Sequence, residues 1–179
     1  MKVVVLTGPE SAGKSSLSTA LAQRFGAPVV REYVREYIEL QQRDTCYADV
    51  EIIAREQWQR EQAARALRPP LLLLDTNLLS NRQWSLALFD RSPQWIDRIL
   101  QQQSYDAVFL LDPEGLPWQA DGQRCQPELA ERKAFHVGLE HWLMQHQQPL
   151  VHVTGNWDRR YRQIEQAIEC LLAGDVAST

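Results

Sequence analysis

The sequence predicts an α/β fold in which helices cover both faces of a five-stranded parallel sheet. Five short apolar runs rich in Val and Leu alternate with longer segments of helical periodicity. Strands that alternate with helices are joined by right-handed crossovers, which make the strands parallel and bury both faces of the sheet. The chain has 179 residues, the size of one globular domain. We therefore expect a single domain at residues 1–174 and a frayed tail at residues 175–179.

The first predicted strand is KVVVLTG, a continuous run of β-branched residues and leucine that ends in glycine. Similar runs predict strands at APVV, PLLLLDT, YDAVFLLD and QPLVHVTG. Helices are predicted between them at Lys14–Phe25, Tyr47–Leu67, Leu78–Gln103 with a break at Ser92-Pro93, Pro127–Gln147 and Trp157–Ala173. The second of these helices has Glu and Arg spaced to pair four residues apart, which indicates a solvated face. The pairs are Glu51/Arg55, Glu56/Arg60 and Glu61/Arg65.

The composition excludes several classes of partner. The net charge is −4 and no run of Lys or Arg occurs, so we expect no nucleic-acid partner. No apolar run is long enough for a membrane span or a signal peptide. The cysteines, Cys46, Cys125 and Cys170, lack CxxC spacing, which favours reduced thiols over disulfides or a zinc site. We expect a cytoplasmic protein with a small-molecule partner, and the sequence leaves its oligomeric state open.

The segment GPESAGKS, Gly8–Ser15, matches the phosphate-binding pattern G-x-x-x-x-G-K-[ST]. It lies between a predicted strand and a predicted helix, the context that this pattern requires. Backbone N–H groups of the loop face the phosphates, Lys14 bridges the β- and γ-phosphates, and the Ser15 hydroxyl binds Mg²⁺. The other residues expected to contact the nucleotide are Gly8, Ser11, Ala12, Gly13 and Ser16. The sequence therefore predicts a three-layer P-loop NTPase or kinase fold that binds ATP and Mg²⁺.

The phosphate loop does not say where the γ-phosphate goes, because hydrolases and kinases share it. The lack of an N-K-x-D segment argues against a GTPase. The chain instead fits a compact phosphotransferase, with acceptor-site helices at residues 31–67 and a flap at residues 112–126, where Pro, Gly and Asp break regular structure. The alternatives are a kinase for another nucleoside or small metabolite, and a regulatory module that hydrolyses ATP slowly.

Two carboxylates follow predicted strands. Glu32 follows the second strand, and Asp75 follows the four leucines of the third. Because parallel strands direct their carboxyl ends toward one crevice, either carboxylate could accept the proton of an acceptor hydroxyl, and Asp75 could also hold Mg²⁺. The sequence does not choose between them. The other interpretations are a solvated helix face for Glu32 and a helix N-cap for Asp75 or Thr76.

Basic and aromatic residues complete the predicted site. Arg124 in the flap is expected to neutralise charge on the transferred phosphoryl group, and Arg132 either shares this role or is an ordinary surface charge. Gly155 and Asn156, after the fifth strand, are candidates to hold adenine. An aromatic residue at helical spacing more often belongs to the core than to a binding site. The candidates to stack on a flat ring are Trp58, Trp84, Trp118, Tyr33 and Tyr37.

The order of five segments resembles the ribosylnicotinamide kinase domain of NadR-type proteins. The segments are GPESAGKS, EYVREY, DTN after the third strand, PWQADGQR after the fourth and VTGNWDRRYRQIEQAI near the end. The resemblance implies ATP-dependent phosphorylation of the 5′-hydroxyl of nicotinamide riboside, which gives nicotinamide mononucleotide for NAD salvage. NadR proteins also carry an adenylyltransferase domain, but the chain contains no H-x-G-H segment. We therefore expect a stand-alone kinase.

The resemblance also implies roles for individual residues. Those that match its motifs are Glu32, Tyr33, Arg35 and Glu36 beside the riboside, Asp75 after the third strand, and Trp118, Asp121, Gly122 and Arg124 in the flap. Two positions depart from the pattern. Arg31 stands where an aromatic residue is expected, and Ala120 replaces an aspartate of the flap. Either Trp58 replaces the missing ring, or the substrate differs.

Glu10 places a carboxylate inside a loop that holds phosphates, which costs Coulomb energy unless solvent or a cation intervenes. The early residues of such a loop lie between the γ-phosphate and the acceptor. We therefore expect Glu10 to point toward the acceptor, where it accepts a hydroxyl hydrogen bond or pairs with Arg31 or Arg124. The alternative is a solvent-facing Glu10 without a partner.

Overall fold

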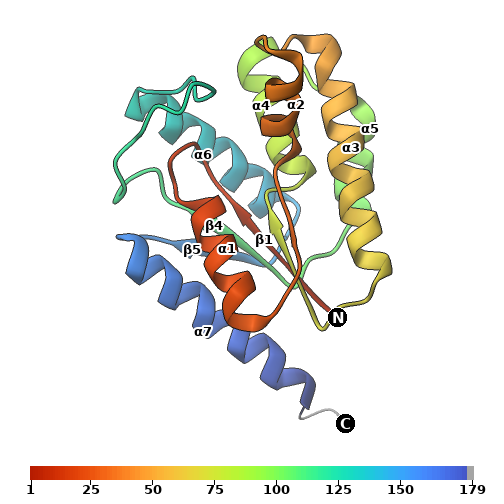
Figure 1. The fold of residues 1–179 in the computed structure, drawn as a ribbon, viewed down its shortest axis with the longest axis vertical. Coiled ribbons are helices and arrows are strands. Elements are labelled where there is room, and N and C mark those ends of the chain that lie inside the picture. Colours follow the sequence, from red (N-terminus) through yellow and green to blue (C-terminus); the bar gives the residue numbers. More distant parts are fainter. Residues whose placement is uncertain (177–179) are drawn as a thin grey trace.

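The computed structural model describes residues 1–176, and in this part of the chain the five predicted strands form one parallel sheet (Figure 1). The strands are β1 (Lys2–Thr7), β2 (Val29–Val30), β3 (Leu71–Asp75), β4 (Ala107–Leu111) and β5 (Leu150–Val153). Their order in the sheet is β2-β3-β1-β4-β5, and every neighbouring pair is parallel. The predicted α/β fold class is confirmed.

Seven helices within residues 1–176 connect and flank the strands. They are α1 (Lys14–Phe25), α2 (Tyr33–Gln41), α3 (Tyr47–Ala66), α4 (Leu78–Phe89), α5 (Gln94–Gln102), α6 (Leu129–Gln145) and α7 (Trp157–Val176). The predicted break at Ser92-Pro93 is confirmed, because Pro93 is the N-cap of α5. Helix α7 includes residues 175 and 176, which were expected to fray, and residues 177–179 of that predicted tail lie outside the described residues. Among the described helices, none has the length and apolar character needed to cross a membrane.

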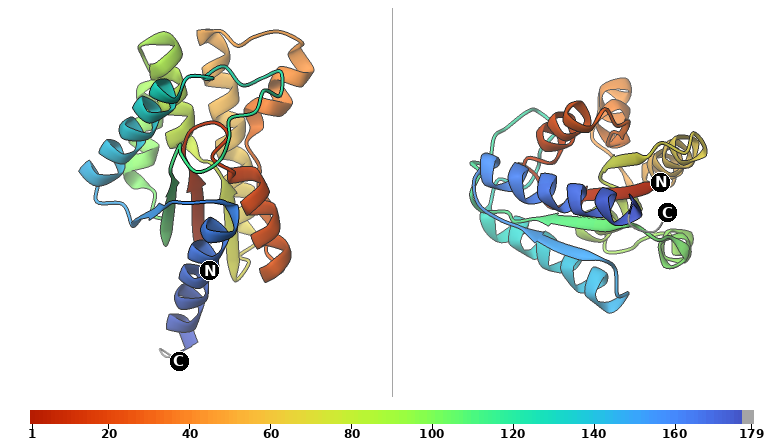
Figure 2. Two further views of the ribbon diagram at one scale, coloured as in Figure 1. Left: turned by 90° about the vertical axis from the view of Figure 1, so that its left-hand side faces the viewer. Right: turned by 90° about the horizontal axis from the view of Figure 1, so that it is seen from below.

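The side chains of the strands alternate between two apolar clusters, one on each face of the sheet. On one face, Val3 and Val5 of β1 belong to a cluster with residues of α3, α4, α5 and α6. On the other face, Val4 and Leu6 belong to a cluster with residues of α1 and α7. Figure 2 shows the resulting layers, with α6 and α7 on opposite sides of the sheet. Burial on both faces explains why β1, β3 and β4 are continuous apolar runs.

Helix α4 begins directly after β3, and its N-cap is Asn77. The side-chain Oδ1 of Asn77 accepts a hydrogen bond from the N–H of Leu79 at 3.1 Å. The N-cap interpretation of Asp75 and Thr76 is therefore wrong. Since β1 and β3 pair with Leu6 opposite Asp75, the end of β3 lies beside the phosphate loop that follows β1.

The Glu–Arg pairs predicted on α3 all form. Glu61, however, is only 1% exposed, and its carboxylate lies 2.8 Å from Nη2 of Arg65. Burial raises the pKa of the Glu61 carboxyl, and the nearby charge of Arg65 acts to lower it. This end of α3 is therefore packed into the domain rather than solvated as predicted.

Candidate active site

Three residues of the phosphate loop have positive φ angles. Gly8, Ser11 and Gly13 have φ of 142°, 57° and 85°. Alternation of such residues turns backbone N–H groups toward one concave side, the geometry that binds phosphate oxygens. A Cβ at Gly8 would lie 2.7 Å from the carbonyl oxygen of Leu111, so a larger residue does not fit there. The loop thus has the backbone conformation that its pattern predicts.

The side chain of Lys14 lies within the loop. Its ammonium donates to the carbonyl oxygens of Gly8 and Pro9 at 2.8 and 2.7 Å. Burial lowers the pKa of this ammonium, and the carboxylates of Glu32 and Asp75 oppose that change. A buried cation at this position is suited to neutralise the charge of a phosphate.

Asp75 and Ser15 lie together at the end of β3. Asp75 is 2% exposed. Burial raises the pKa of its carboxyl, and a hydrogen bond from the Ser15 hydroxyl opposes the rise. In the described residues, Oδ1 of Asp75 is buried without a hydrogen-bond partner. A hydroxyl and a carboxylate with an unused oxygen are the hard oxygen ligands that Mg²⁺ prefers, so these residues fit the predicted ion.

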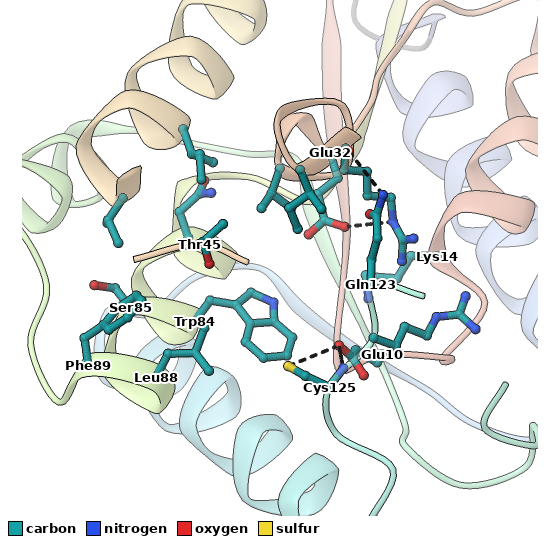
Figure 3. A pocket seen from close by; sticks show the side chains of 17 residues that line it. Glu10, Lys14, Glu32, Thr45, Trp84, Ser85, Leu88, Phe89, Gln123 and Cys125 are labelled. Carbon is teal, nitrogen blue, oxygen red and sulfur yellow. Dashed lines mark hydrogen bonds and ion pairs between the residues drawn. The ribbon is translucent and has the colours of Figure 1, made fainter. Parts of the chain in front are cut away.

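Two cavities adjoin at the carboxyl ends of the strands. The first, here called the phosphate cavity, has a volume of about 400 Å³ and is lined by the phosphate loop and the flap, residues 112–126. The second, here called the apolar cavity, has a volume of about 130 Å³ and lies between α2, α3, α4 and the flap (Figure 3). Four charged residues line both cavities: Lys14, Glu32, Arg35 and Arg124. The cavities therefore meet at these side chains, which form the junction.

The apolar cavity has helical walls and unused polar atoms. Its apolar lining consists of Val34, Ile38, Val50, Ile53, Trp84, Leu88 and Phe89. Two amide oxygens of lining residues, Asn81 Oδ1 and Gln123 Oε1, are buried without a hydrogen-bond partner among the described residues. Buried acceptors of this kind are normally satisfied, so a ligand with N–H or O–H donors would complete the cavity.

Glu32 is the N-cap of α2, but its side chain makes no capping hydrogen bond. One carboxylate oxygen lies 3.6 Å from Nε of Arg35. Burial raises the pKa of the Glu32 carboxyl, and Lys14 is the strongest of the groups that lower it. A carboxylate at the junction is placed to accept a proton from a hydroxyl in the apolar cavity.

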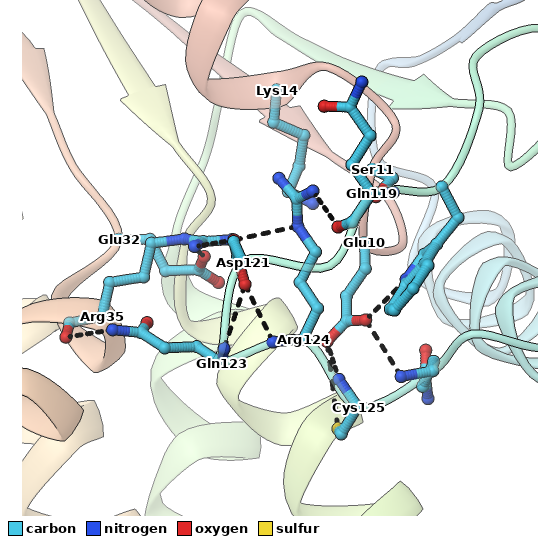
Figure 4. A network of polar contacts seen from close by, with 12 residues as sticks. Glu10, Ser11, Lys14, Glu32, Arg35, Gln119, Asp121, Gln123, Arg124 and Cys125 are labelled. Atoms are coloured by element: carbon cyan, nitrogen blue, oxygen red, sulfur yellow. Dashed lines mark hydrogen bonds and ion pairs between the residues drawn. The ribbon is translucent and has the colours of Figure 1, made fainter. Parts of the chain in front are cut away.

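Asp121 organises the flap. Its carboxylate accepts hydrogen bonds from the backbone N–H groups of Gln123 and Arg124 at 3.1 and 3.0 Å. The other oxygen lies 2.8 Å from Nη1 of Arg35 and 3.1 Å from Nε of Arg124 (Figure 4). These contacts join the flap to α2 and hold Arg124 at the junction, and the role predicted for it on the phosphoryl group stays a prediction.

Glu10 points from the phosphate loop toward the flap (Figure 4). Its carboxylate accepts hydrogen bonds from the backbone N–H groups of Cys125 and Gln126, both at 3.0 Å, and from the indole N–H of Trp118 at 3.4 Å. Glu10 also lines the apolar cavity. Its side chain has partners, so the interpretation of a solvent-facing, unpaired Glu10 is wrong.

A family model described as an AAA domain matches residues 3–160, a stretch that includes the phosphate loop, both cavities and the flap. The chain belongs to this AAA domain family. It is 26% identical over 174 residues to the trifunctional NAD biosynthesis/regulator protein NadR of Salmonella typhimurium. That alignment covers 94% of this chain and 42% of the relative, so the chain spans less than half of the relative's length.

Solved structures of NadR share the fold of this AAA domain. A NadR structure in complex with NR matches with a TM-score of 0.78 and 24% identity, covering 93% of this chain and 50% of the other. A NadR structure in complex with NAD and AMP-PNP matches with a TM-score of 0.75 and 22% identity, covering 93% and 48%. The resemblance to NadR-type proteins predicted from the motifs is confirmed.

Several aromatic residues of this AAA domain lie elsewhere than predicted. Trp58 packs against an apolar cluster of the core and lines neither cavity, whereas Trp84 lines the apolar cavity. The guanidinium carbon of Arg60 lies over the ring of Tyr33, 4.4 Å from the ring centroid. Tyr33 also lines neither cavity. Tyr37 is buried. These four aromatic residues lie on α2, α3 and α4, and the rotation of each helix about its axis decides which ring faces a cavity.

Two arginines have partners that the sequence did not predict. Arg31 donates a hydrogen bond to the hydroxyl of Thr19 at 3.2 Å. The predicted pairing of Glu10 with Arg31 or Arg124 is therefore wrong, because backbone N–H groups of the flap are its partners. Arg132 is 6% exposed, and its guanidinium donates to the carbonyl oxygen of Gln126 at 2.9 Å. Arg132 is therefore an anchor for the end of the flap, neither a surface charge nor a residue of the junction.

Asn156 has a structural role in the AAA domain. Its side-chain oxygen accepts a hydrogen bond from the N–H of Arg159 at 3.0 Å, which closes the first turn of α7. Asn156 lines neither cavity, so its predicted contact with adenine has no support in the geometry. Ser16 does line the phosphate cavity, and its hydroxyl accepts a hydrogen bond from the indole of Trp157 at 3.0 Å.

Arg160, which the sequence interpretation missed, is fully buried. Its guanidinium donates to the carbonyl oxygens of Gly155 at 2.6 Å, of Ala12 and Asp112 at 2.9 Å, and of Glu114. Arg160 therefore ties the phosphate loop to the segments that follow β4 and β5. Arg160 precedes the buried Ile164 and Ile168 at four-residue spacing, whereas Arg159 and Arg162 are exposed, so helical periodicity could have placed it on the buried face of α7.

Proposed function

We propose that this domain is a kinase that transfers the γ-phosphate of ATP to the 5′-hydroxyl of nicotinamide riboside, giving nicotinamide mononucleotide for NAD salvage. The observation that carries the proposal is the junction, where the phosphate cavity and the apolar cavity share four charged side chains. A phosphate donor in one cavity and a hydroxyl acceptor in the other meet there. Direct transfer needs such a meeting point, whereas slow hydrolysis does not.

Each group at the junction has a role in the transfer. Lys14 and Arg124 neutralise charge on the phosphoryl group as it moves. Glu32 accepts the proton of the 5′-hydroxyl as the hydroxyl oxygen bonds to the γ-phosphorus, while the bond from that phosphorus to ADP breaks and ADP leaves with its electron pair. Asp75 lines neither cavity, which favours Glu32 as the base. Asp75 and Ser15 would hold Mg²⁺, which supplies further neutralisation of phosphate charge when bound.

The apolar cavity suits a positively charged pyridinium ring. Trp84 lines the cavity and can contact such a ring by cation–π attraction, and the carboxylates of Glu10 and Glu32 offset part of the positive charge of Lys14, Arg35 and Arg124 in the same lining. The names of the relatives give support to the proposed substrate. NadR has been solved with NR, the abbreviation of nicotinamide riboside, and with NAD and AMP-PNP, and the curated NadR acts in NAD biosynthesis.

The test is a panel of ribosides incubated with the protein and Mg-ATP, with ADP release and phosphorylated product measured for each. We expect nicotinamide riboside to have the highest kcat/KM. We also expect nicotinic acid riboside to react at least about 10-fold less efficiently, because its carboxylate brings further acceptors to a cavity whose unused groups are acceptors.

Each contrary outcome of the panel has its own meaning. Preference for another nucleoside contradicts the substrate and keeps the kinase. ADP release that no riboside raises above the rate with ATP alone contradicts the kinase and supports a regulatory nucleotide-binding module.

Replacement of Asp75 by Asn is expected to raise the Mg²⁺ concentration for half-maximal activity by about 10–100-fold. The amide keeps the shape of the side chain but removes the negative charge from the oxygen beside Ser15. Initial rates over a range of free Mg²⁺ measure the effect. Asp158→Asn, an exposed position on α7, is the matched control. A Mg²⁺ dependence that stays at the wild-type value in Asp75→Asn contradicts the assignment.

A further inference from the structure

Most of the hydrogen bonds between the phosphate loop and the flap involve one side chain. The carboxylate of Glu10 accepts hydrogen bonds from the backbone N–H groups of Cys125 and Gln126 and from the indole N–H of Trp118 (Figure 4). All of these partners are donors, and an ionised carboxylate is a pure acceptor. The negative charge of Glu10 is therefore compensated by hydrogen-bond donors of the flap.

We infer that Glu10 is a positioning residue that fastens the flap to the phosphate loop and so builds the wall between the two cavities. The bond to Cys125 fixes the backbone next to Arg124, which lines both cavities. Gln123 and Cys125 line the apolar cavity from the same segment. The position of this wall thus depends on Glu10, a residue of the phosphate loop itself.

The flap has other attachments, so loss of Glu10 loosens one segment without releasing the whole flap. The hydroxyl of Ser11 accepts a hydrogen bond from the N–H of Gln119 at 3.2 Å. Asp121 binds Arg35 at 2.8 Å. These contacts hold residues 119–121, whereas Glu10 holds residues 125 and 126.

Glutamine cannot replace Glu10 in this arrangement. One N–H of the flap donates to each carboxylate oxygen, Cys125 to Oε1 and Gln126 to Oε2. An amide keeps one acceptor and turns an NH₂ group toward the other N–H, so two donors face each other. Glu10→Gln therefore breaks at least one of the two backbone bonds and weakens the attachment, with almost no change of size.

A loosened flap admits water to the junction. Water then competes with the riboside hydroxyl for the γ-phosphate, which gives ADP and free phosphate in place of a phosphorylated riboside. In Glu10→Gln we expect the KM for riboside to rise about 10-fold, the KM for ATP to change less than about 2-fold, and the ratio of ADP to phosphorylated riboside to rise above one.

Backbone hydrogen exchange tests the attachment directly, without any reference to the proposed kinase activity. In Glu10→Gln we expect the amides of Cys125 and Gln126 to exchange at least about 10-fold faster than in the wild type, with β1 unchanged. Trp118→Phe removes only the indole bond, which is longer than the two backbone bonds, and should give a smaller increase. The matched control is Glu165→Gln, which removes a carboxylate from a pair with Arg24 and should change neither segment.

The readouts separate the inference from the proposed function. Unchanged exchange at residues 125 and 126 in Glu10→Gln overturns the attachment. Faster exchange with an unchanged KM for riboside overturns the coupling between flap and cavity. If no riboside is phosphorylated, the proposed function fails and the exchange rates decide the role of Glu10.

Discussion

Replacement of Glu32 by Gln is expected to lower kcat for riboside phosphorylation by about 10²–10⁴-fold, the usual contribution of a general base. The amide occupies the same place at the junction but accepts no proton. Nucleotide affinity should change little, because the phosphate loop is intact. Single-turnover transfer and ATP titrations measure the two effects separately, and Glu39→Gln, an exposed position on the same helix, is the control.

The pH dependence of the wild type tests the same residue. Burial raises the pKa of the Glu32 carboxyl, Lys14 and Arg35 lower it, and Asp75 and Glu10 raise it. Because the base must be unprotonated, kcat/KM should fall as the pH drops through this raised pKa and level off above it. The acidic limb should therefore lie above the ordinary range of a glutamate.

Glu32→Gln should lack this acidic limb. If Glu32→Gln keeps the wild-type limb and Asp75→Asn loses it, the base is Asp75 and the roles proposed for the two carboxylates are reversed.

Replacement of Arg160 by Met is expected to lower the free energy of unfolding by at least about 3 kcal/mol. Methionine fills much of the space, but several buried carbonyl oxygens, including those of Ala12 and Asp112, lose their donor. Urea denaturation measures the loss. Arg162→Met, an exposed neighbour on α7, should change stability by less than about 0.5 kcal/mol.

The same variant reports on the phosphate loop. Since Arg160 holds the carbonyl of Ala12, the loop should be less ordered in Arg160→Met, and ATP affinity should fall even at temperatures where the variant is folded. Wild-type stability together with wild-type ATP affinity would show that the buried guanidinium has no structural role.

The fold was predictable because its signals are local. Each strand is a run of apolar residues, and each helix has its own periodicity, so both can be read within a short window of sequence. The same holds for Lys14, which belongs to a contiguous pattern. Glu32 and Asp75 could be placed because the ends of parallel strands share one edge of the sheet.

The partners of side chains were less predictable, because they depend on contacts distant in sequence. Glu10 meets Cys125 across 115 positions, and Arg160 meets Ala12 across 148. The choice between Trp58 and Trp84 depends on how two helices are rotated against the sheet, which apolar periodicity does not fix to within one side chain. The resemblance named the flap, but it did not reveal what holds the flap in place.

The buried guanidinium has a consequence for the order in which the domain is assembled during synthesis. The phosphate loop is complete once Ser15 has been made, yet the side chain that holds the carbonyl of Ala12 comes from residue 160. The phosphate loop is therefore stabilised by a side chain that is made 148 residues after Ala12. A nascent chain that ends before α7 should fold its sheet without a fully formed nucleotide site.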